Sequence, residues 1–84
     1  MSLNKISNLP AVREIISRKD FKQIELEFPG RKMITIDEDR MEQELTKFVE
    51  DQTHTLNFML IPQEVNVGNI NVLNVFVFPE IEAA

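Results

Sequence analysis

The stretch Thr55–Pro79, TLNFMLIPQEVNVGNINVLNVFVFP, decides the fold. It carries only one charged residue, Glu64, in a chain that is 27% charged, so much of its apolar surface has to be covered. Apolar residues alternate with others on both sides of Gly68, which is typical of two β-strands. The asparagines around Gly68 predict an irregular loop or bulge over residues 66–69. From Leu73 onward both faces of the second strand are mostly apolar, and such a strand needs cover on both sides.

Before this stretch, the sequence predicts a helix followed by a β-hairpin. Asn8 and Pro10 are typical of a helix start, and apolar residues at helical spacing extend the predicted helix over residues 9–19. Apolar and polar residues then alternate over residues 21–28 and again over residues 31–36. The Pro-Gly pair between these two runs is suited to a type II turn.

A second helix links this hairpin to the C-terminal strands. Asp37 is a suitable N-cap, and apolar residues three or four apart predict a helix over residues 38–52. The order of elements is therefore α-β-β-α-β-β. It predicts an α+β fold with a four-stranded, mainly antiparallel sheet and two helices packed on one face.

Length and composition limit the class of protein. The 84 residues predict a single domain over 1–84, with residues 1–8 poorly ordered or partly a cloning remnant and residues 80–84 forming a flexible tail. Such a domain buries only about 60–65% of its unfolded surface, so oligomerisation would help to stabilise it. The sequence lacks cysteine, an apolar leader segment and a long apolar run, and it therefore predicts a soluble cytoplasmic protein.

The apolar C-terminal strand has two structural solutions. Either the helices pack on opposite faces of the sheet, or the uncovered face or an edge of the sheet meets another chain. We favour the second, since about 26 helical residues are too few to cover two faces, and we expect the strand to be central or paired across a dimer. The hypothesis is a non-enzymatic interaction or assembly module that binds a second copy or another protein, through Asn71, Leu73, Asn74, Val75, Val77 and Phe78.

Charge offers an alternative function. The net charge is −5, but residues 1–34 hold seven basic and four acidic residues, whereas residues 35–84 hold two basic and ten acidic ones. An acidic protein repels phosphate backbones at long range, so nucleic-acid binding requires basic residues gathered on one face. The alternative hypothesis is therefore an anionic-ligand or nucleic-acid site formed by Lys19, Lys22, Arg31 and Lys32.

The sequence offers little for catalysis or metal binding. His54 is the only histidine, and no nucleophile set accompanies it. The acidic run at residues 37–39 lacks the glycine and the bidentate glutamate of an EF-hand loop, so we interpret it as helix capping. We therefore expect no catalytic residue, no cofactor and no metal, and we expect no membrane association.

Overall fold

The computed structural model describes residues 5–52 and 57–80, which form a single α+β domain. Its elements follow in the order α1 (Leu9–Arg18), β1 (Gln23–Phe28), β2 (Arg31–Thr35), α2 (Glu38–Glu50), β3 (Asn57–Val67) and β4 (Ile70–Glu80). The predicted order and fold class are confirmed.

The four strands form one sheet in the order β2-β1-β4-β3. β1 pairs antiparallel with β2, β3 pairs antiparallel with β4, and parallel pairing of β1 with β4 joins the two hairpins. The last strand is therefore central, which was one of the two expected positions. Over residues 72–76 it has neighbours on both sides, so this part of the strand cannot pair across a dimer.

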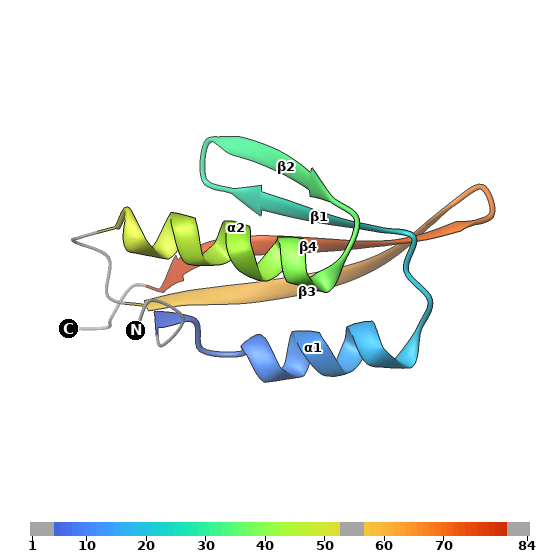
Figure 1. The fold of residues 1–84 in the computed structure, drawn as a ribbon, viewed down its shortest axis with the longest axis horizontal. Helices are drawn as coiled ribbons and strands as arrows, with labels where there is room; N and C mark the ends of the chain where they lie inside the picture. The colour runs from blue at the N-terminus through green and yellow to red at the C-terminus, as the bar shows by residue number, and fades with distance from the viewer. Residues whose placement is uncertain (1–4, 53–56, 81–84) are drawn as a thin grey trace.

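Both helices lie on the same face of the sheet (Figure 1). Leu9 and Val12 of α1 are buried in the same core as the apolar stripe of α2, which comprises Met41, Leu45 and Val49. The two helices are also tied directly, because the Arg13 guanidinium binds the carboxylates of Glu42 and Glu38. The arrangement with helices on opposite faces is excluded.

The core fills the space between the sheet and the helices. Alternate residues of the strands point into it, including Ile24 and Leu26 of β1 and Leu60 of β3. The Phe48 ring of α2 contacts two core rings, with centroid separations of 4.5 Å to Phe28 and 5.1 Å to Phe58. These contacts hold α2 against the sheet, and both helices of the described residues lie on this side of it.

The segment just before α1 is part of the sheet, although the sequence suggested a poorly ordered start. Ile6 is buried and forms a parallel bridge with Phe58, and the Ser7 amide donates to the Phe58 carbonyl at 2.9 Å. The Asn8 side chain donates to the Leu60 carbonyl and accepts from the Leu60 amide. Asn8 occupies the N-cap of α1, so the predicted helix start is confirmed, but its side chain makes no cap bond, and the capping that makes asparagine typical of this position is absent here.

Each of the two hairpin turns contains a glycine with a positive φ. Gly30 has φ 86° in the first hairpin, which fits the predicted type II turn, and Gly68 has φ 64° in the second. The β3–β4 connection is a two-residue turn at Gly68 and Asn69, and Asn66 lies within β3, so the irregular loop expected over residues 66–69 is wrong. A tight turn lets both strands extend to 11 residues, and their hairpin projects beyond the helices (Figure 1).

Candidate functional site

The candidate site is the sheet face opposite the helices, which no other described element covers and which we call the open face. Side chains alternate between the two faces of a strand, so the paired residues Met59 and Phe78 point away from the helices. Among the described residues, the large hydrophobic side chains that are strongly exposed all follow this alternation onto the open face or just beyond β2: Ile34, Ile36, Met59, Ile61, Val67, Ile70 and Phe78. Five of these seven residues lie on the adjacent strands β3 and β4 and form a patch rather than scattered exceptions.

The centre of the open face carries no charge. Twelve positions of β3 and β4 point to this face, and the last of them is Glu80 at the end of β4. The other eleven are eight apolar residues and three amides, and we call them the neutral strip: Asn57, Met59, Ile61, Gln63, Val65, Val67, Ile70, Val72, Asn74, Phe76 and Phe78. Gln63 and Asn74 are cross-strand partners in the middle of it. The strip therefore has a polar centre between two apolar halves.

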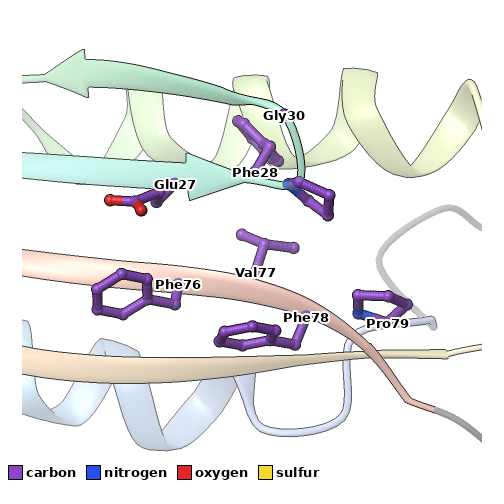
Figure 2. Close-up of a pocket in the computed structure, with 8 residues that line it drawn as sticks. Glu27, Phe28, Gly30, Phe76, Val77, Phe78 and Pro79 are labelled. Carbon is purple, nitrogen blue, oxygen red and sulfur yellow. The ribbon is translucent and has the colours of Figure 1, made fainter.

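A shallow depression of about 350 Å³ opens at one end of the neutral strip (Figure 2). It forms because the pairing of β1 with β4 stops at Glu27 and Phe76, whereas β4 continues to Glu80. Phe76 and Phe78 lie along its wall with their rings stacked, 6.2 Å apart and 27° from parallel. The depression can receive an apolar side chain next to the Glu27 carboxylate.

An acidic border separates the neutral strip from β2. Glu25 and Glu27 of β1 point to the open face, and the Lys32 ammonium lies 3.0 Å from the Glu25 carboxylate. The hydrogen bond to Glu25, helped by the charges of Glu25 and Glu27, raises the pKa of Lys32. One cation therefore faces two carboxylates along this border, which remains negative.

The predicted interface residues fall on both sides of the sheet. Leu73, Val75 and Val77 are at most 2% exposed and pack under the helices, so they cannot form a surface of this chain. Asn71 also points to the helical side, where its amide binds the Asp20 carbonyl and the Asn66 side chain. Only two of the six residues, Asn74 and Phe78, lie on the open face.

The sequence interpretation missed the β3 contribution to this face. Met59 and Ile61 are exposed and are the direct partners of Phe78 and Phe76. Their alternation was visible, but the side that faces the helices depends on strand order. The sequence feature that could have identified the exposed side is the polar face of β1. Glu25 on that face lies beside Asn74, so the face of β4 that carries Asn74 is the one that faces solvent.

The four basic residues of the alternative hypothesis do not form one patch. Lys19 and Lys22 precede β1, while Arg31 and Lys32 follow it, and a six-residue strand separates the two pairs by roughly 20 Å. Lys19, Lys22 and Lys32 each lie within 3.1 Å of a carboxylate. Arg31 stacks on the Phe28 ring, 5.3 Å from its centroid.

A second hollow, of about 310 Å³, lies where α1 ends beside β3. Ile15, Arg18, Lys19 and Glu64 line it, and the Lys19 ammonium lies 2.6 Å from the Glu64 carboxylate. The hydrogen bond to Lys19 and its charge lower the pKa of Glu64. The ion pair therefore uses two of the three charged side chains that line the hollow.

The described residues include no group of three or more His, Cys, Asp or Glu side chains that could hold a metal ion. The buried carboxylate of Glu44 lies near the cations of Arg40 and Lys47, at 3.5 and 3.9 Å. His54 falls outside the described residues. No helix in the described part of the chain is long and apolar enough to cross a membrane.

Comparisons with protein-family models, curated proteins and solved structures found no match for this chain. The functional proposal therefore rests on the geometry of the open face.

Proposed function

We propose that the chain is a small non-enzymatic interaction or assembly module that binds another protein surface through the open face of its sheet. The observation that supports the proposal is the grouping of the strongly exposed large hydrophobic side chains on the face that the helices leave uncovered. A contiguous exposed apolar patch on a small domain typically marks an interaction site. The amides and the acidic border would supply polar contacts at its centre and rim.

The edges of the sheet are less suitable for association. Ile6 and Asn8 occupy the start of the β3 edge, and Pro62 lacks the N–H that strand pairing would use next along it. β2, at the other edge, has only five residues. Association through the open face needs neither edge.

The basic residues give no comparable reason to propose anion or nucleic-acid binding. Three of the four are paired with carboxylates, and the net charge of −5 opposes phosphate. No described feature favours that alternative over the open face.

Substitution of Ile61 by lysine tests the proposal. Ile61 is 44% exposed next to the polar centre of the neutral strip, so the folded chain tolerates the charge, but an interface would bury it without a partner. We expect Ile61→Lys to abolish association measured by light scattering at micromolar concentration and to leave the circular dichroism spectrum unchanged.

Gln43→Lys is the matched control, because Gln43 is exposed on α2, on the other side of the sheet. This variant should associate as the natural chain does. If the natural chain does not self-associate, the same three proteins are used to capture partners from a lysate. Equal behaviour of the natural chain and Ile61→Lys in both assays would reject the open face as the binding surface.

A further inference from the structure

We infer that the occupant of the open face is a second copy of this chain, related by a two-fold axis that passes the Gln63–Asn74 pair. The inference rests on the proposed function and adds the partner and its register. Each copy would lay its neutral strip on the strip of the other, so that two sheets pack face to face with the helices outside.

The position of the amides supports this axis. Gln63 has two apolar strip positions on either side of it along β3, and Asn74 has two on either side of it along β4. A residue on a two-fold axis meets its own copy, and an amide is self-complementary because it both donates and accepts hydrogen bonds. The polar centre of the strip would thus satisfy itself in the dimer.

The two apolar halves of the strip differ in side-chain size, and this difference also supports an axis that runs across the strands. The half beside the depression has long or aromatic side chains, and the half beside the turn has mostly valines: Met59, Ile61, Phe76 and Phe78 against Val65, Val67, Ile70 and Val72. An axis across the strands places the large half of one copy over the small half of the other. An axis along the strands would instead stack phenylalanines on phenylalanines and leave valines facing valines.

The area of the face agrees with a symmetric dimer. With strands spaced about 4.8 Å apart and a rise of about 3.4 Å per residue, the four strands of the open face project to roughly 540 Å², and the two strands that carry the neutral strip account for roughly 360 Å² of this area. Standard-size interfaces bury about 800 Å² of accessible surface on each partner, and protruding side chains raise the accessible area above the projection. A second sheet covers the whole neutral strip and leaves the acidic border at the rim, whereas a single peptide would leave much of the strip exposed.

Charge favours a second copy over a cationic partner. The neutral strip has no charge to attract a basic protein, and of the two border carboxylates Glu25 is already paired with Lys32, which leaves Glu27 at the rim. Two copies of net charge −5 repel each other, and a contact made only through uncharged residues keeps those charges at the rim.

A pair of opposite charges at position 63 tests the axis. In a Gln63→Lys dimer, the lysine of one copy would meet the lysine of the other across the axis. In a Gln63→Glu dimer, two glutamates would meet in the same way. Each variant alone should raise the dimer dissociation constant at least about tenfold, as measured by sedimentation velocity. An equimolar mixture should recover dimer, because lysine in one copy then faces glutamate in the other.

The register of the halves has its own test. The proposed axis places Ile61 of one copy over Val65 of the other, since both are two residues from Gln63. Ile61→Lys and Val65→Glu should each dissociate alone and form a heterodimer when mixed, whereas an axis along the strands predicts no recovery. Circular dichroism of every variant establishes that it is folded, and Gln43→Lys is the control for added charge.

The outcomes separate this inference from the proposed function. Recovery in both mixtures supports the two-fold register. A dimer that Ile61→Lys dissociates, but that neither mixture restores, overturns the register and leaves the open face as the binding surface. A monomeric natural chain overturns the second copy as occupant, and the proposed function then stands only if a partner binds the natural chain and not Ile61→Lys.

Discussion

Asn8 closes part of a sheet edge with a single side chain. Its amide pairs with both the N–H and the C=O of Leu60, as a neighbouring strand would. The sequence correctly indicated a helix start here, but the side chain had two competing uses, a helix cap or a strand edge. The choice depends on β3, which is 52 residues away and cannot be identified as the partner from local sequence.

We predict that Asn8→Ala lowers the free energy of unfolding by about 1–3 kcal/mol, because it leaves the amide and carbonyl of Leu60 without these hydrogen bonds. Urea denaturation followed by circular dichroism measures the change. Asn66→Ala is the matched control, since Asn66 is exposed and bonds only another exposed side chain among the contacts seen. Equal effects of the two substitutions would contradict the edge-closing role of Asn8.

The Lys19–Glu64 pair predicts a pH effect of defined sign. The pKa of Glu64 in the folded chain is lowered from its ordinary value of 4.5, so the pair stabilises the fold above that value. The contribution is lost as pH falls below 4.5 and through the folded-state pKa. In Lys19→Met the pKa of Glu64, measured by NMR titration of its carboxyl carbon, should rise toward 4.5, and an unchanged titration would show that the pair does not form in solution.

At the scale of elements, β4 has two apolar faces, one packed in the core under the helices and one exposed on the open face. Leu73 is fully buried under the helices, whereas Phe78 is 48% exposed on the open face. The sequence showed that the strand is apolar on both sides and which residues share a side, but not which side packs under the helices. Both faces follow the same alternation, and only the position of the helices distinguishes them.

Two truncations in β4 should therefore have separate effects. Leu73→Ala should lower the free energy of unfolding by about 2–5 kcal/mol, because it opens a cavity in the core. Phe78→Ala should change the stability of the isolated chain far less and should weaken association instead. Chemical denaturation measures stability, and light scattering measures association. A large loss of stability in Phe78→Ala, at concentrations where the chain is monomeric, would contradict the assignment of Phe78 to the binding surface rather than to the core.

The elements themselves were largely predictable, whereas their assembly was not. Caps and apolar spacing placed both helices to within two residues of their observed ends, and alternation identified all four strands. The strand order depends on parallel pairing between residues as distant as Gln23 and Val72. No local pattern encodes that pairing, so four of the six proposed interface residues were assigned to the wrong side.

At the scale of the whole molecule, the two described helices cover one face of the sheet, and no other described element covers the opposite face. The two helices supply one side of the core, and the uncovered side retains the exposed hydrophobic residues. The negative charge lies outside the neutral strip, so self-association brings together apolar surfaces on molecules that repel each other at long range.

Sedimentation of the natural chain at micromolar concentration, in low and in moderate sodium chloride, tests this association most directly. We predict a species of twice the 9.8 kDa chain mass, with a larger dimer fraction at higher salt because salt screens the repulsion between two acidic copies. A mass of 9.8 kDa under both conditions, or a dimer that dissociates as salt is added, would contradict self-association through the neutral strip.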